Sequence, residues 1–322
     1  MTLERVLATL QQWALFAGVG VLVGCVVWRA AVVPRAVRMV GDTHTARLLR
    51  IERRVAGVGA ITVLVLVGAW ALRMVVQVMG FRDPFVPLSE DVSFLLFETF
   101  WGTVWMAQGA ILPLLAVAFW RARGPVREDV GLGAAPGQGI SLRISTAWGV
   151  ALALVLMLVA TLALTGHAMG VDSGRPFIVA ADALHTLASG SWIGSLGIIL
   201  TVGHPAERTG EDVALFAAQL RGFSTVALVS VSTLIAMGVV LAWTHLDVPS
   251  SLWTTGYGRI LSAKVAVAGL VFAAGLWNWR VGLPSCETSD GAAAVRRRAA
   301  LEVGLAGGVL LLTAVLVHSV KP

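Results

Sequence analysis

Residues 144–166, ISTAWGVALALVLMLVATLALTG, contain no charged side chain. A run of about 20 apolar residues is long enough to cross the hydrocarbon core of a bilayer as an α-helix. Because lipid offers no partner to an open peptide group, the backbone of such a run must be helical. This stretch therefore predicts a membrane-spanning helix and decides the class of fold.

Seven further segments have the same character: 11–33, 55–79, 102–120, 177–202, 222–243, 260–280 and 299–320. The composition agrees, since 57% of the residues are hydrophobic and only 13% are charged, against roughly 25% charged residues in soluble domains. We therefore expect an all-α, polytopic bundle of about eight transmembrane helices. The high isoelectric point then reflects the charges of the connecting loops, so we expect no nucleic-acid partner.

The positive charges are distributed unevenly between the loops. The connections after the first, third, fifth and seventh helices hold sixteen arginines, whereas the other side, including both termini, holds five Lys and Arg residues. Because Lys and Arg accumulate in cytoplasmic loops, we expect both termini to lie on the outer side of a membrane that the chain crosses several times.

Three regions follow from this division. Residues 1–122 hold three helices and a long external loop, 80–101, with room for a short interfacial helix around 94–100. Residues 123–143 are rich in Gly and Pro and predict a flexible cytoplasmic linker. Residues 144–322 hold the remaining five helices.

Four of the six histidines fall on the outer side in this topology: His167, His185, His245 and His318. Ionisable side chains inside a bilayer usually face the bundle interior and mark a substrate or ion path. For His245 and His318 taken alone, a contact with lipid headgroups is the simpler interpretation.

The most suggestive group is His185 with Asp182 and His167. Asp182 and His185 are spaced i, i+3 and share a helix face, so the carboxylate could orient one ring nitrogen and leave the other for a metal. The short connection after His167 can bring both rings together. Imidazole suits copper, zinc, iron and nickel, and a thioether such as Met169 adds a preference for Cu(I). Met169 is equally explained as packing.

Several stretches together carry a family resemblance. They are TGHA (165–168), DALHTLASGSWIG (182–194), FSTVALVSVSTLIAMGVVLA (223–242), TTGYGRILSAK (254–264), NWRVGLP (278–284) and ALEVGLAGGVLLLTAVLV (300–317). In this combination the chain resembles the copper resistance protein D (CopD) family of bacterial inner-membrane proteins. The resemblance implies movement of copper from periplasm to cytoplasm, or its transfer within the membrane, often beside a periplasmic CopC-like protein. Both termini are too short for a fused CopC-like domain, so we expect any such donor to be a separate protein.

The same resemblance implies a set of functional polar positions: His167, Asp182, His185, Tyr257, Lys264, Asn278 and Glu302. Lys264 can snorkel to headgroups, or it can face inward and bind Asp182, Tyr257 or a backbone carbonyl. Glu302 lies near three arginines, 296–298, which favours an interfacial ion pair, and an exit ligand for copper is the alternative.

Three functions remain open at this point. The first is a copper-handling membrane protein whose cargo is a copper ion. The second is a membrane redox protein in which the same histidines hold haem b. The third is a metal-delivery or assembly factor that binds copper without transporting it. No ATP-binding motif or recognisable phosphorylated aspartate is present, so we expect no enzymatic activity and no pump.

Overall fold

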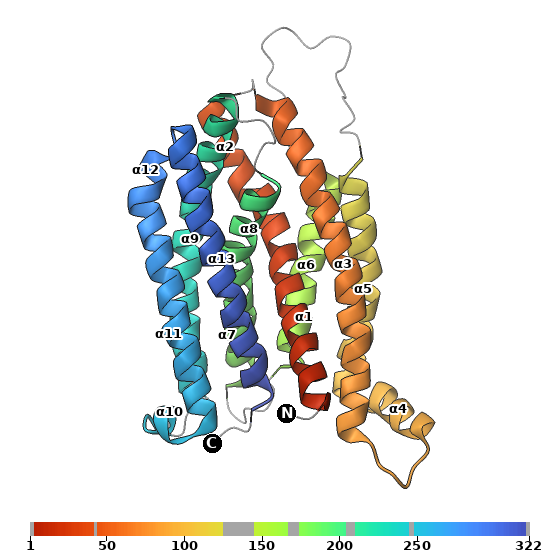
Figure 1. The fold of residues 1–322 in the computed structure, drawn as a ribbon. Helices are drawn as coiled ribbons and strands as arrows, with labels where there is room; N and C mark the ends of the chain where they lie inside the picture. The colour runs from red at the N-terminus through yellow and green to blue at the C-terminus, as the bar shows by residue number, and fades with distance from the viewer. Residues whose placement is uncertain are drawn as a thin grey trace.

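The computed structural model describes residues 3–41, 44–124, 145–166, 174–203, 210–244 and 248–319. Within these residues the chain forms helices and no strand, and eight helical segments are long and apolar enough to cross a membrane. The expected all-α transmembrane bundle is confirmed. Figure 1 shows the long helices running side by side from one end of the bundle to the other.

The first half of the chain supplies three spans. The first consists of α1 (Leu3–Val27), the π-helix η1 (Trp28–Val32) and α2 (Val33–Val40); the second is α3 (Thr45–Phe81), and the third is α5 (Phe100–Ala122). Between α3 and α5 lies the short helix α4 (Leu88–Phe97), which begins and ends earlier than the interfacial helix expected near 94–100.

The second half supplies five spans. They are α6 (Thr146–Ala163); α7 (Arg175–Ser189) with the π-helix η4 (Gly190–Gly194) and α8 (Ser195–Thr201); α9 (Gly210–Trp243); α11 (Gly256–Trp277) with the π-helix η5 (Asn278–Gly282) and α12 (Leu283–Ser285); and α13 (Ser289–Val317). A single turn, α10 (Ser251–Thr254), precedes α11. Residues 125–143, most of the predicted linker, lie outside the described residues, so its flexibility stays a prediction.

Several helices are longer than their apolar cores predict. The sixth span was expected to begin at residue 222, but α9 begins at Gly210. Its first turn carries Glu211 and Asp212, and carboxylates at that position interact favourably with the helix dipole. The helix therefore continues beyond the apolar core into a polar region, which hydropathy alone does not detect.

The helix α1 lies at the centre of the bundle. In its most apolar stretch 61% of the residues are buried, against 11% in the sixth and seventh spans, and Figure 1 shows it between α3 and α13. The π-helix η1 that follows ties it to two other helices. Arg29 forms a buried ion pair of 2.9 Å with Glu52 of α3, and Trp28 Nε1 donates a 3.0 Å hydrogen bond to Gln219 Oε1 of α9.

Glycines let α1 and the fifth span approach closely. A Cβ placed on Gly194 would lie 2.0 Å from the carbonyl oxygen of Gly20, and one on Gly24 would lie 2.2 Å from the backbone of Gly194. Gly20 and Gly24 face Gly190 and Gly194, so each helix brings a small-xxx-small pair to the crossing. These glycines have the packing role expected of the GSWIG segment.

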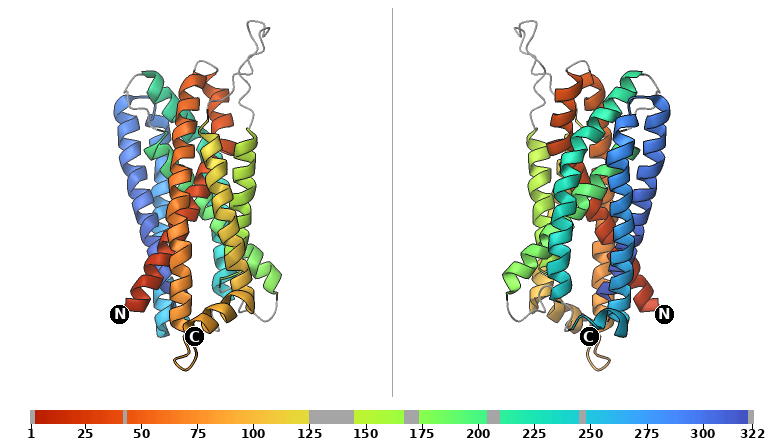
Figure 2. Two further views of the ribbon diagram at one scale, coloured as in Figure 1. Left: turned by 90° about the vertical axis from the view of Figure 1, so that its right-hand side faces the viewer. Right: turned by 90° about the vertical axis from the view of Figure 1, so that its left-hand side faces the viewer.

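The two chain termini lie at the same end of the bundle, together with α4 and α10 (Figures 1 and 2). This arrangement follows from the even number of spans. Which compartment that end faces stays the prediction that rests on loop charge.

Candidate functional site

His185 lies on α7 and faces α9. A Cβ placed on Gly238 of α9 would lie 3.6 Å from His185 Cε1, and the imidazole interacts with the backbone carbonyl of Leu234. The Nδ1 atom is buried and has no hydrogen-bond partner among the described residues. Neutral imidazole binds metals through one nitrogen while a second group orients the other, so this ring is positioned as a ligand would be.

The orienting role expected of Asp182 stays a prediction. None of the hydrogen bonds found between described side chains joins Asp182 to His185, and the imidazole interacts with the backbone carbonyl of Leu234. The carboxylate of Asp182 turns toward the end of α6, where a Cβ on Gly166 would lie 3.5 Å from Oδ2. The i, i+3 spacing sets a shared helix face, but the rotamers direct the two polar groups apart.

Lys264 of α11 supplies the charge opposite Asp182. The ammonium interacts electrostatically with Asp182 and also lies within range of His185. Lys264 is only partly exposed. The sequence allowed it either to snorkel to lipid headgroups or to face inward, and the structure favours the inward orientation. This part of the bundle thus brings together one carboxylate, one ammonium and one imidazole from α7 and α11.

A second polar cluster lies deeper in the same bundle. Glu302 of α13 is 2% exposed and accepts a 3.1 Å hydrogen bond from Asn278 Nδ2 and another from Trp192. None of the ion pairs found in the described residues joins Glu302 to the arginines at 296–298, which are exposed. The expectation of an interfacial ion pair is therefore wrong: the carboxylate faces the bundle interior, where neutral donors satisfy it.

Both donors to Glu302 come from π-helices. Trp192 lies in η4 and Asn278 in η5. A π-turn inserts an extra residue into the helix and re-aims the side chains around it, and such turns are frequent at functional sites. The i, i+7 spacing of His185 and Trp192 places both on one helix face, but nothing in the sequence indicates that the indole meets Glu302.

The remaining predicted residues are less closely grouped. His167, Met169 and His245 lie outside the described residues, so their proposed roles stay predictions. His318 is exposed at the end of α13 and contacts the backbone of Ala8, while Tyr257 is buried with Leu261 and Leu316. Over the described part of the chain, no group of three His, Cys, Asp or Glu side chains is close enough to hold a metal ion.

The two cysteines do not contribute a soft ligand. Both are buried and unbridged. Burial raises the pKa of the Cys286 thiol to about 11, so it stays protonated at neutral pH, whereas the thiolate is the metal-binding form. Cys25 is packed inside α1 and contacts the carbonyl oxygen of Val55.

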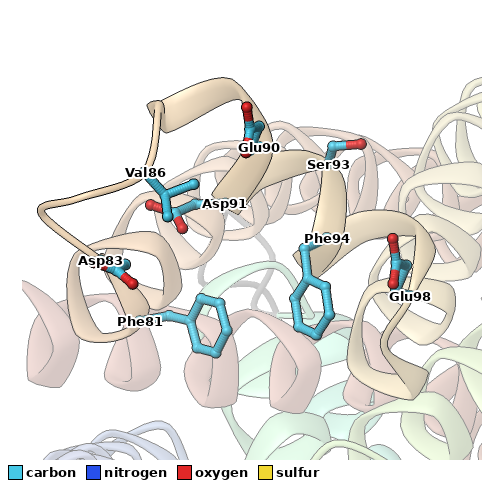
Figure 3. A pocket seen from close by; sticks show the side chains of 8 residues that line it. All are labelled: Phe81, Asp83, Val86, Glu90, Asp91, Ser93, Phe94 and Glu98. Carbon is cyan, nitrogen blue, oxygen red and sulfur yellow. The ribbon is translucent and has the colours of Figure 1, made fainter.

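An acidic pocket lies in the loop and helix between α3 and α5. It has a volume of about 570 Å³ and is lined by Phe81, Asp83, Val86, Glu90, Asp91, Ser93, Phe94 and Glu98. Figure 3 shows its four carboxylates spread around the rim and not converging on one point. Asp91 is also paired with Arg82. This pocket can attract cations to the surface, but it lacks the convergent geometry of a metal site.

Comparison with known proteins finds a similarity to copper resistance proteins. Residues 217–316 match the family model of copper resistance protein D. Copper resistance protein D of Pseudomonas syringae pv. tomato is 28% identical over 253 residues, which cover 75% of each protein. The copper transport protein CutJ of Bacillus subtilis (strain 168) is 28% identical over 171 residues, or 52% of this chain and 28% of that longer protein. No solved structure matches the chain significantly.

The resemblance inferred from sequence motifs is thereby confirmed. The matched region contains α11 and most of α9 and α13, and so it includes Lys264, Asn278 and Glu302. His185, Asp182 and Trp192 lie before it and fall on the fifth span. The two polar clusters described above are therefore assembled from both the matched region and the helix that packs against it.

Proposed function

We propose that this protein handles copper ions in the bacterial inner membrane and moves them from the periplasm toward the cytoplasm. The observation that carries this proposal is the buried Nδ1 of His185, which has no hydrogen-bond partner among the residues that the structure describes, in a chain similar to copper resistance and copper transport proteins. A buried imidazole nitrogen without a partner costs free energy, and a bound cation would remove that cost.

The proposed entry site consists of His185 with His167, and Met169, His245 and His318 are further candidate ligands from the outer side. Asp182 contributes negative charge that offsets Lys264, so the cation is not repelled by an uncompensated ammonium. A transporter must bind its ion and also release it. Glu302, with Asn278 and Trp192, is the second polar site on the proposed path of the ion, inward from His185.

A separate periplasmic CopC-like protein is the proposed donor of copper. The acidic pocket between α3 and α5 is lined mainly by residues of α4 and its flanks, and α4 lies at the same end of the bundle as both termini (Figure 1). If that end is periplasmic, the rim adds a negative potential on the side from which copper arrives. A protein that sheltered copper without transporting it would use the same entry site but show no flux.

Metal content and the visible absorption spectrum of the detergent-purified protein test the proposal. We expect the wild type to contain copper, and we expect His185→Ala and His167→Ala each to bind copper at least tenfold more weakly. The control His44→Ala should bind copper like the wild type, because His44 lies at the opposite end of the bundle. Copper-dependent uptake into proteoliposomes then separates transport from storage. A Soret band without copper would show that the protein binds haem, as the haem b alternative predicts. Equal copper content in all variants would exclude the proposed site.

A further inference from the structure

Arg73 of α3 is a membrane cation without a carboxylate partner. It lies eight residues before the end of α3 at Phe81, or about 12 Å along the helix axis. Its Nη1 donates a 3.3 Å hydrogen bond to Gln108 Oε1, and its Nη2 donates a 2.9 Å hydrogen bond to Thr165 Oγ1. Both partners are neutral, and none of the ion pairs found among the described residues includes Arg73. Charged groups inside a membrane span normally have a countercharge.

Two buried amides add donors without acceptors at this position. Gln108 and Gln11 are each 3% exposed, and the Nε2 atom of each has no hydrogen-bond partner among the described residues. The Oε1 atom of Gln108 already accepts a hydrogen bond from Arg73, so the Nε2 amino group of Gln108 is the donor that has no acceptor among the described residues. A buried donor without an acceptor costs about 1–3 kcal/mol.

Helix register places Gln11 level with Arg73. A Cβ on Gly18 of α1 would lie 2.7 Å from Leu66 Cδ2 of α3, and a Cβ on Gly80 would lie 3.8 Å from Glu4 Oε1. These two contacts fix the antiparallel register of α1 and α3. Gln11 is seven residues before Gly18, and Arg73 is seven residues after Leu66. Seven residues are about two helical turns, so both side chains return to the shared interface.

Aromatic rings hold the guanidinium in place. Arg73 lies over the ring of Trp101 at 5.7 Å. One turn away, Trp70 and Trp105 stack at 4.0 Å, and each donates its indole N–H to the other's backbone carbonyl. Tryptophans of this kind mark the headgroup level of a bilayer. The cluster is thus a rigid set of donors near the level of lipid phosphates.

We propose that Arg73, Gln108 and Gln11 form a binding site for an oxyanion, namely the phosphate group of an anionic phospholipid or free phosphate. Arginine and amide N–H groups are the donors that phosphate oxygens require. Arg73 supplies positive charge, and none of the ion pairs among the described residues joins it to a carboxylate. This site lies on the first three spans, outside the region that matches the copper resistance family, and it does not depend on the proposed copper function.

The test measures thermal unfolding in detergent for the wild type, Arg73→Gln and the control Arg259→Gln. Arg259 is an exposed arginine near the start of α11. Dioleoylphosphatidylglycerol should raise the midpoint of the wild type and the control by about 3–5 °C over the same amount of dioleoylphosphatidylcholine. Arg73→Gln should lose this shift. A shift with inorganic phosphate as well would show that the phosphate group alone suffices, whereas a shift with phosphatidylglycerol alone would identify a lipid site. No Arg73-dependent shift with either probe would overturn the proposal.

A second variant covers the case in which Arg73→Gln does not fold. Gln108→Glu places a carboxylate beside Arg73 and removes the unpartnered amino group. We expect a higher midpoint without added lipid and no further rise with phosphatidylglycerol. A Gln108→Glu protein that responds to phosphatidylglycerol like the wild type would contradict the site. Copper content measured on the same samples should stay at the wild-type level, which separates this inference from the proposed function.

Discussion

At the residue scale, two groups of polar side chains inside the spans are held by specific partners. Asp182 offsets Lys264, while Glu302 is satisfied by Asn278 and Trp192. The first pair matches two charges from different helices, and the second group surrounds one carboxyl with neutral donors. Removing one member of either group should therefore lower the free energy of unfolding, because its partner is left buried without a countercharge or hydrogen bond.

The Asp182 and Lys264 pair predicts non-additive stability. Asp182→Asn and Lys264→Met should each lower the free energy of unfolding, because each leaves one charge without its countercharge. The double variant should be more stable than the sum of the two losses implies, with a coupling of about 1 kcal/mol. Unfolding of the four proteins in one detergent measures the coupling. Additive losses would mean that the two charges do not interact.

The Glu302 cluster predicts a difference between two substitutions. Glu302→Ala leaves the Asn278 and Trp192 donors buried without an acceptor and should destabilise the protein by about 2–4 kcal/mol. Glu302→Gln keeps an oxygen that can accept from Asn278 and should cost about half as much or less. Thermal unfolding compares the two. If Gln proved as damaging as Ala, the negative charge itself would be needed, and copper flux should then be measured in the Gln variant.

At the element scale, the crossing of α1 and η4 depends on backbone contact. A Cβ on Gly194 would lie 2.0 Å from Gly20 O, whereas a Cβ on Gly197, one turn along in α8, meets nothing within 4 Å. The two glycines belong to the same span but have different surroundings. This contact also fixes the position of Trp192, which lies between Gly190 and Gly194.

Alanine substitution separates these two glycines. Gly194→Ala should force the helices apart and cost about 1–3 kcal/mol, and it should lower copper flux because Trp192 moves with the crossing. Gly197→Ala should be neutral or stabilising by up to about 1 kcal/mol, since Ala favours the helix. Unfolding midpoints and copper uptake of the two variants test this. Equal behaviour of the two variants would show that the close crossing is not required.

At the scale of the whole molecule, eight spans place both termini at one end (Figure 2). The opposite end carries most of the arginines of the connecting segments, including those near the junction of α2 and α3. The positive-inside rule then assigns that end to the cytoplasm. The direction of copper movement proposed above rests on this orientation.

Reporter fusions test the orientation of the bundle. Alkaline phosphatase, which is active only in the periplasm, should be active when fused after Pro322 and inactive when fused after Arg123, at the end of α5. A fusion after Phe85, in the connection between α3 and α4, should again be active. The opposite pattern at all three positions would invert the bundle and place His185 on the cytoplasmic side.

The sequence by itself determined the number of spans, their helical nature, the common side of the two termini and the family resemblance. These features depend on local properties: apolar length, the need to satisfy backbone hydrogen bonds inside lipid, and the order of motifs along the chain. The packing role of the GSWIG glycines was also readable, because small residues at i, i+4 permit close helix approach.

Only the tertiary structure decided which polar groups meet. The charge of Asp182 interacts with Lys264 of another helix. Glu302 turns inward to Asn278 and Trp192, where an ion pair with nearby arginines was expected. Arg73 falls within a predicted span, but nothing in the sequence links it to Gln108 and Gln11. The physical reason is that a partner on another helix is selected by helix register, rotamer and π-turns. Sequence spacing specifies the face of a helix but not the group that packs against it.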